Sequence, residues 1–330
     1  MISITPVEDG KSLAMRDAWG AKLIELGDHD DRCLVLDGDL ANSTKAEVFA
    51  AAHPDRFFEM GIAEQNMLGV AAGLATVGYI PWISTFAAFL AKRALDQIRV
   101  VIAQPGLNVK MCGSYSGILT GKTGKTHQAV EDIAVFRAMP GVVTIAPADD
   151  VELRAAMDAM MNDERPTYLR LTRDESPTIF PPDYPFEIGR GVLLREGEDI
   201  GIVSTGVQTV RALDAARFLQ DDGISAAVLH IPTLKPLDIE AICTLASRTR
   251  ALVVTEDHSI IGGLGGAVAE TLAEQCPTRI LRVGMQDTYG ESAPNDALLE
   301  KYGLTARHVA NAARKLIGVV STADRGEIER

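Results

Sequence analysis

The sequence has few of the features that mark a disulfide scaffold, a metal cluster or a nucleic-acid surface. Its four cysteines include no CxxC pair and no histidine at metal-ligand spacing, so we expect reduced structural thiols at Cys33, Cys112, Cys243 and Cys276. The formal net charge is −13, which excludes the basic face that a nucleic-acid binder or an anionic-membrane binder needs.

Long uninterrupted hydrophobic runs are also absent. Residues 65–91 carry no charge, but Gly69, Gly73, Gly78 and Pro81 interrupt them, so we expect a buried α/β unit and no membrane span. The first residues show no basic segment followed by an apolar run, and we therefore expect a cytoplasmic protein. A length of 330 residues with 47% hydrophobic content predicts about two globular domains.

Short apolar runs alternate with helical stretches along the chain. This pattern predicts two consecutive α/β domains with mainly parallel sheets. We expect a first domain over residues 1–175, a proline-rich linker over 176–190, a second domain over 191–320 and a tail over 321–330. The predicted strands are 33–37, 57–60, 79–85, 108–112, 142–146, 167–171, 200–204, 226–230, 251–255 and 279–283, and a last helix is expected over 305–317.

One carboxylate stands at the start of an otherwise apolar helix. Glu64 lies in the segment 61–67 (GIAEQNM), after a strand-like run. Such a strand-to-helix turn is where ligands bind in α/β sheets, so Glu64 is a candidate for activating a cofactor. Alternatively, it only benefits from the helix dipole, which is worth about 0.3–1 kcal/mol. We expect the helix to be buried because of its apolar residues Met67, Leu68, Val70, Ala71, Leu74 and Ala75.

Two further segments have both a chemical and a structural interpretation. The glycine-rich segment 117–128 lacks the glycine spacing of a phosphate-binding P-loop. Because the segment carries Lys122, Lys125 and His127, it could close over an anionic substrate as a mobile loop. Alternatively, it is a solvated surface loop. Phe86 and Phe89 lie three residues apart on one helix face, where they form either core or a platform for a flat heterocycle.

These segments together resemble the C-terminal half of a transketolase, which comprises the pyrimidine-binding domain and the C-terminal domain. The resemblance extends from about Arg16 to Ile317. Its most specific stretches are 36–44 (LDGDLANST), 53–57 (HPDRF), 61–67, 84–89 (STFAAF), 126–128 (THQ) and 131–137 (EDIAVFR).

The resemblance implies thiamine diphosphate chemistry with Mg²⁺. Glu64 matches the glutamate that hydrogen-bonds the aminopyrimidine ring and favours its imino tautomer. Phe86 and Phe89 match the aromatic contacts to that ring. Asp39 and Ile62 are the remaining residues expected to contact the cofactor.

The resemblance also implies a phosphorylated sugar substrate. His127 matches a catalytic histidine that binds the donor's terminal hydroxyl, and two guanidiniums with a hydroxyl suit a phosphate dianion. Departures from the family pattern point to an unusual sugar, branched or carrying another anion: Tyr115 replaces a phosphate-binding histidine, Thr123 replaces an aspartate, and the loop lysines replace acidic and apolar residues. The expected substrate-binding residues are Arg16, Ser43, Arg173, His127, Tyr115, Thr123 and Lys125.

No Gly-Asp-Gly motif with a downstream asparagine, which would hold the magnesium and the diphosphate, occurs in the sequence. We therefore expect no metal ligand on this chain. An N-terminal subunit should supply the ligands in an α2β2 assembly, and this chain should be inactive by itself. The second domain is expected to serve in assembly. Two alternatives remain: the β subunit of a 2-oxoacid dehydrogenase E1 component, which the Arg16, Ser43 and Arg173 set and the loop 126–128 disfavour, and a cofactor-free scaffold subunit.

Overall fold

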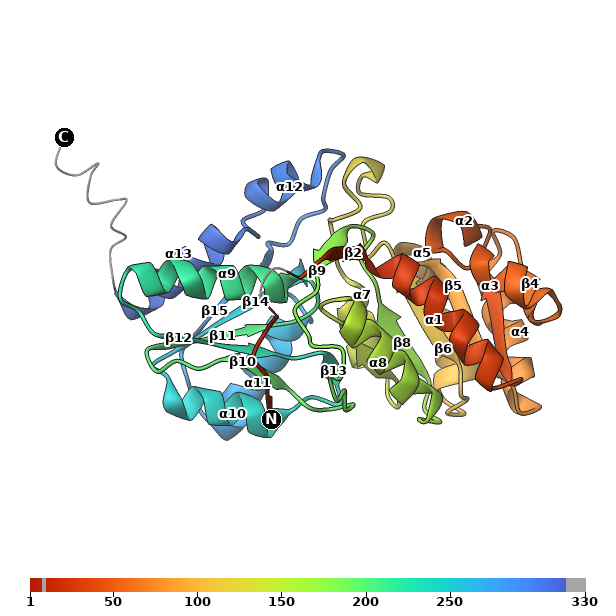
Figure 1. Cartoon of the computed structure of the whole chain (residues 1–330), viewed down its shortest axis with the longest axis horizontal. Helices are drawn as coiled ribbons and strands as arrows, with labels where there is room; N and C mark the ends of the chain where they lie inside the picture. The colour runs from red at the N-terminus through yellow and green to blue at the C-terminus, as the bar shows by residue number, and fades with distance from the viewer. Residues whose placement is uncertain (8–9, 319–330) are drawn as a thin grey trace.

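The computed structural model describes residues 1–7 and 10–318. It contains two large sheets, both mainly parallel and both covered by helices on two faces, arranged one after the other along the long axis (Figure 1). The predicted fold of two consecutive α/β domains is confirmed, whereas the predicted tail 321–330 lies outside the described residues. Within the described part, no helix is long and apolar enough to cross a membrane.

The first sheet has seven strands in the order β13-β7-β8-β6-β5-β3-β4. All neighbours are parallel except β13 and β7. Its strands are β3 (Cys33–Asp37), β4 (Phe57–Glu59), β5 (Ile80–Phe86), β6 (Lys110–Ser114), β7 (Val143–Ile145), β8 (Thr167–Arg170) and β13 (Thr233–Lys235). Its helices are α1 (Met15–His29), α2 (Ala41–Thr44), α3 (Glu47–Ala52), η1 (Pro54–Arg56), α4 (Glu64–Thr76), α5 (Ala87–Arg93), α6 (Leu95–Gln97), η2 (Ile98–Ala103), η3 (Gly121–Thr123), α7 (Asp132–Ala138) and α8 (Asp150–Met161).

Alternation along β3 explains why helices cover both faces of this sheet. Val35 packs with Trp19 of α1, and Leu36 packs with Met67 of α4 on the opposite face. The expectation of a buried helix is confirmed at Met67, Leu68 and Ala71 and is wrong at Val70, which is 37% exposed. One face of α4 packs on the sheet, and the other face is open.

The second sheet has six strands in the order β1-β10-β12-β11-β14-β15. The strands are β1 (Ile2–Ser3), β10 (Val192–Arg195), β11 (Ile200–Ser204), β12 (Ala226–His230), β14 (Leu252–Ser259) and β15 (Ile280–Met285). The helices are α9 (Gln208–Asp221), α10 (Ile239–Arg248), α11 (Leu264–Gln275), α12 (Asn295–Lys301) and α13 (Ala306–Ile317). α9 and α13 cover one face, and α10 and α11 cover the other (Figure 1).

The two halves of the chain exchange strands. The N-terminal β1 pairs with β10 in the second sheet, and β13 pairs antiparallel with β7 in the first. A third, two-stranded sheet joins β2 (Ser12–Ala14) to β9 (Glu175–Pro177). The proline-rich segment after β9 is anchored as well, because Asp149 Oδ2 accepts hydrogen bonds from the backbone N–H groups of Ile179 and Phe180 at 2.6 and 2.8 Å. The segment between the sheets therefore belongs to a packed junction.

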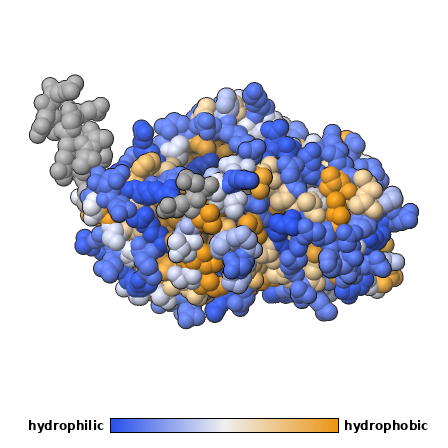
Figure 2. All heavy atoms as spheres, viewed as in Figure 1, coloured by the Kyte–Doolittle hydropathy of each residue, from blue (hydrophilic) through white to orange (hydrophobic). Residues whose placement is uncertain are grey.

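Hydrophilic residues cover most of the surface in the view of Figure 2, and hydrophobic residues show mainly in its middle part. The apolar material is concentrated in the interior, on both faces of each sheet.

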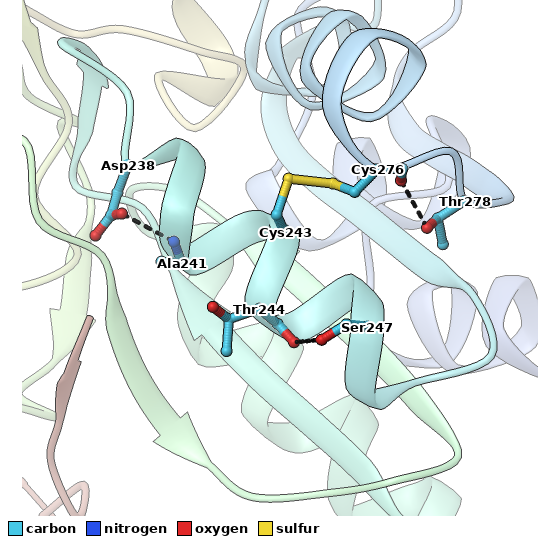
Figure 3. Close-up of a disulfide and its surroundings, with 7 residues drawn as sticks. All are labelled: Asp238, Ala241, Cys243, Thr244, Ser247, Cys276 and Thr278. Carbon is cyan, nitrogen blue, oxygen red and sulfur yellow. Dashed lines mark hydrogen bonds between the residues drawn. A yellow bond between two sulfur atoms is a disulfide. The ribbon is translucent and has the colours of Figure 1, made fainter.

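The prediction of four reduced thiols is wrong for one pair. Cys243 on α10 and Cys276 at the end of α11 form a disulfide (Figure 3). The two residues are 33 positions apart, and only the packing of α10 against α11 brings them together. Cys33 and Cys112 are free and buried, as expected, and burial raises the pKa of each thiol to about 12.

Candidate active site

Glu64 is the first residue of α4. The chain leaves β4 at Glu59 and turns through Gly61, whose φ of +68° favours a residue without a side chain. The Glu64 side chain is fully buried, and Arg93 Nη1 donates to both of its carboxylate oxygens at 2.7 Å. The predicted carboxylate thus lies at the predicted strand-to-helix turn, with a cation beside it.

Sequence reasoning missed Arg93. This arginine is the last residue of α5, and its guanidinium lies over the Phe89 ring, 4.8 Å from the centroid. The spacing of four residues from Phe89 was the available signal, because side chains at i and i+4 meet on one helix face. The contact with Glu64 spans 29 positions and has no sequence signal.

The predicted aromatic pair is part of a larger ring cluster. Phe86 stacks on Phe89 with centroids 5.7 Å apart, and on Tyr115 with centroids 4.0 Å apart. His127 meets both phenylalanines edge-on, at 5.9 Å from Phe86 and 5.3 Å from Phe89. These four residues come from the end of β5, from α5 and from both ends of the loop 115–127.

Two of the predicted anion-binding residues, Arg16 and Arg173, meet at Tyr115, whereas the Ser43 hydroxyl donates to Asn42 Oδ1 at 3.2 Å. Arg16 Nη1 donates to the Tyr115 hydroxyl at 3.0 Å and to the backbone carbonyl of Ser43 at 3.2 Å. The Arg173 guanidinium lies 5.5 Å from the centroid of the Tyr115 ring. Tyr115 has a φ of +58°, a left-handed conformation that is unusual for a bulky residue. Two guanidiniums, a phenol and the ring cluster therefore form one continuous group of contacting side chains.

Other predicted residues lie apart from this cluster. Asp39 is exposed, and its backbone N–H donates to Glu59 Oε1 at 2.9 Å. Ile62 is 72% exposed. The Thr123 hydroxyl contacts that of Thr120 within the loop, and Lys125 is exposed. Their contacts with a cofactor or a sugar stay predictions.

Asp37 fixes the turn that carries Ser43. It is fully buried at the end of β3, where it accepts from the backbone N–H of Leu40 at 2.6 Å and from Thr44 Oγ1 at 3.3 Å. Burial raises the pKa of this carboxyl to about 6. Sequence reasoning had placed this residue at the end of a strand and in the stretch 36–44, without a role of its own.

The donor set of the cluster fits the aminopyrimidine half of thiamine diphosphate. A buried carboxylate can hydrogen-bond a ring nitrogen, and aromatic faces beside it can contact a flat ring. Within residues 1–7 and 10–318, no group of three or more His, Cys, Asp and Glu side chains is placed to hold a metal ion. The described surface thus offers groups for a ring and an anion.

Two family models match the chain along most of its length: the transketolase pyrimidine binding domain over residues 11–178, and the transketolase C-terminal domain over residues 189–309. This chain belongs to the transketolase family.

Its relatives within the transketolase family include short chains of similar length. A 6-deoxy-6-sulfo-D-fructose transketolase subunit from Clostridium sp. (strain MSTE9) is 42% identical over 92% of this chain and 94% of its own length. A putative transketolase C-terminal section from Methanocaldococcus jannaschii is 42% identical over 94% of this chain and 97% of its own length. A solved structure described as a split gene transketolase, inactive beta4 tetramer, is 47% identical, covers 94% of this chain and 99% of its own, and superposes with a TM-score of 0.85.

These matches favour the transketolase interpretation over the E1 β subunit. The transketolase family uses thiamine diphosphate, which agrees with the ring-binding character of the Glu64 cluster.

Proposed function

We propose that this chain is the C-terminal subunit of a two-chain transketolase that transfers a two-carbon ketol unit from a ketose to an aldose. The observation that carries the proposal is the fully buried Glu64 beside the ring cluster of Phe86, Phe89, Tyr115 and His127. Bound thiamine diphosphate supplies the carbon nucleophile that accepts the two-carbon unit.

This chain's residues perform the supporting steps. Glu64 would hold and exchange a proton at a nitrogen of the aminopyrimidine ring, and Phe86 and Phe89 would hold the ring and exclude water. His127 hydrogen-bonds a donor hydroxyl from the loop side. Arg93 Nη1 contacts both Glu64 oxygens, and each oxygen has a second acceptor site with which Glu64 would bond to the ring.

The anion of the sugar is assigned to Arg16, Arg173 and the Tyr115 hydroxyl. Two guanidiniums suit a terminal phosphate or a terminal sulfonate, since both present three oxygen acceptors. A neutral phenol where many relatives have a histidine favours the anion of lower charge, and a relative at 42% identity is described as a sulfofructose transketolase subunit. Competing a 6-sulfo ketose against a 6-phospho ketose distinguishes the two anions, and Tyr115→His should shift the ratio of kcat/KM values toward the phosphate.

The open face of α4 is the proposed contact for the N-terminal subunit. Gly69 and Gly73 would meet no atom within 4 Å if they carried a Cβ, so a second backbone can approach them closely. Ile62, which is 72% exposed, lies in the turn before this helix and two residues from Glu64, so a contact there would lie at the edge of the cofactor site. The exposed apolar side chains nearby are Phe58, Ile62, Val70, Val77, Tyr79 and Val100.

This partner subunit completes the site with the ligands for Mg²⁺ and the diphosphate, in an α2β2 assembly. The relative described as an inactive beta4 tetramer supports the view that such a subunit needs its partner for activity. The proposal keeps the cytoplasmic location expected from the sequence.

The test mixes this chain with its N-terminal subunit, thiamine diphosphate and Mg²⁺, and follows two-carbon transfer from a ketose phosphate or sulfonate to an aldose phosphate. Transfer that needs both chains supports the proposal. Decarboxylation of a 2-oxoacid without ketol transfer would assign the chain to the E1 class and overturn the roles of Arg16 and Arg173.

A further inference from the structure

A carboxylate of the second domain lies at the base of the loop that joins Tyr115 to His127. Asp257, in β14, is 2% exposed, and its Oδ1 accepts the backbone N–H of Ile118 at 3.1 Å. The neighbouring Gly117 has a φ of +70°, and a Cβ there would lie 1.9 Å from Asp257 Oδ2. The loop passes directly over the carboxylate because residue 117 has no side chain.

One first-domain residue, Arg170, holds the backbone of Asp257, and Asp132 holds Arg170. Arg170 of β8 donates from Nη2 to the Asp257 carbonyl at 2.7 Å and from Nε to Asp132 Oδ2 at 2.8 Å. Both Arg170 and Asp132 are buried, and the Tyr168 hydroxyl donates to the same Asp132 oxygen at 2.6 Å. The position of the carboxylate is therefore set by strands of both sheets.

The second domain also contacts the far side of the loop. The Ser292 hydroxyl donates to the carbonyl of Lys122 at 2.6 Å, and Asn295 Nδ2 donates to the carbonyl of Leu119 at 3.2 Å. Figure 1 shows α12, which begins at Asn295, beside this loop, drawn in yellow. The loop is thus held at its base and near its tip by one domain, although it belongs to the other.

We infer that the second domain positions the substrate loop, with Asp257 and Ser292 as positioning residues for donor binding. Tyr115 and His127 stand at the two ends of this loop, and both pack on Phe86. A shift of the loop moves the hydroxyl-binding and anion-binding groups relative to the ring cluster. The inference rests on the proposed function of these two residues, and it gives the second domain a part in substrate binding beyond assembly.

The kinetic test uses the two-chain enzyme with Asp257→Ala, Asp257→Asn and Ser292→Ala. Loss of one hydrogen bond that holds the loop corresponds to about a tenfold change. We expect Asp257→Ala and Ser292→Ala to raise the donor KM about tenfold with kcat within about threefold of the wild type. Asp257→Asn keeps an acceptor for the Ile118 N–H and should restore most of the donor affinity.

The matched control is Ser247→Ala. Ser247 is an exposed serine of α10 whose hydroxyl donates to the carbonyl of Thr244 at 2.8 Å (Figure 3), in the same domain and away from the loop. This variant should leave the donor KM unchanged. An equal rise in KM for Ser247→Ala and Ser292→Ala would overturn the inference, because the effect would then be a general one of the second domain.

A second readout does not depend on activity. Lys122 and Lys125 are exposed loop residues and offer trypsin two cleavage sites. Cleavage there should be about tenfold faster in Asp257→Ala and Ser292→Ala than in the wild type and in Ser247→Ala. If the proposed function fails, faster cleavage still supports loop positioning by the second domain. Unchanged cleavage together with an unchanged donor KM overturns it.

Discussion

Replacing Glu64 by glutamine separates catalysis from folding in this subunit. The amide has the shape of the carboxylate and still accepts a hydrogen bond from Arg93 Nη1, but it cannot take up and release a proton at the cofactor ring. Positioned acid–base groups contribute about 10²–10⁴ to a rate. We therefore expect ketol transfer by the two-chain enzyme to fall by about 10²–10⁴ in Glu64→Gln.

The expected cost in stability follows from the exposure of the ion pair. The Glu64 side chain is 0% exposed and that of Arg93 is 45% exposed. The pair lies between an exposed one, worth about 0–1 kcal/mol, and a buried one, whose disruption costs about 3–5 kcal/mol. A loss of about 1–2 kcal/mol in unfolding free energy corresponds to a thermal midpoint lower by about 2–8 °C.

The assay compares initial transfer rates, complex formation by sedimentation and thermal midpoints for the wild type and two variants. Glu47→Gln is the matched control, because Glu47 also lies in the first turn of a helix and has a lysine 3.5 Å away, but is outside the ring cluster. A Glu64→Gln complex that assembles and keeps more than about one tenth of the wild-type rate would refute the catalytic role. It would favour the scaffold alternative.

Three further outcomes are expected. The folded-state pKa of Asp37 is about 6, against an ordinary 3.8, so the protonated carboxyl stabilises the fold below pH 4, and this contribution of about 3 kcal/mol is lost as pH rises through 6. In urea unfolding, the stability of Asp37→Asn relative to the wild type should therefore increase by about 3 kcal/mol between pH 4 and pH 7. A stability difference that does not change with pH would contradict this. Cys243→Ser removes a cross-link to Cys276 over 33 positions, which loop-closure entropy makes worth about 3–4 kcal/mol. A reductant should lower the thermal midpoint of the wild type to that of the variant. A wild-type midpoint that does not change with reductant would argue against the disulfide. Val77 is 71% exposed on the open face at the end of α4, and Val77→Asp should weaken binding of the N-terminal subunit at least about tenfold. Phe218→Asp, at a 43% exposed site on α9, should leave this binding unchanged. Equal effects of the two variants would show that the α4 face is not the contact.

The strands that the sequence predicts best are the buried central ones. β3, β11 and β12 have the predicted bounds, since a continuous apolar run between polar turns is a local property of the chain. The strands that sequence reasoning missed, such as β1 and β13, are two or three residues long, which is too short to show an alternation of apolar and polar residues. They form because the other domain offers an open sheet edge at that place.

The candidate site likewise has features that are local in the sequence and contacts that depend on the tertiary structure. The position of Glu64 at a helix start and the spacing of Phe86 and Phe89 are local, so the sequence by itself determined them. The Arg93 contact with Glu64 and the Asp257 contact with Ile118 join residues 29 and 139 positions apart. Which side chains meet over such separations depends on strand order and on the packing of the two domains, because hydrogen bonds and ion pairs act only over a few ångströms. Only the tertiary structure decided them.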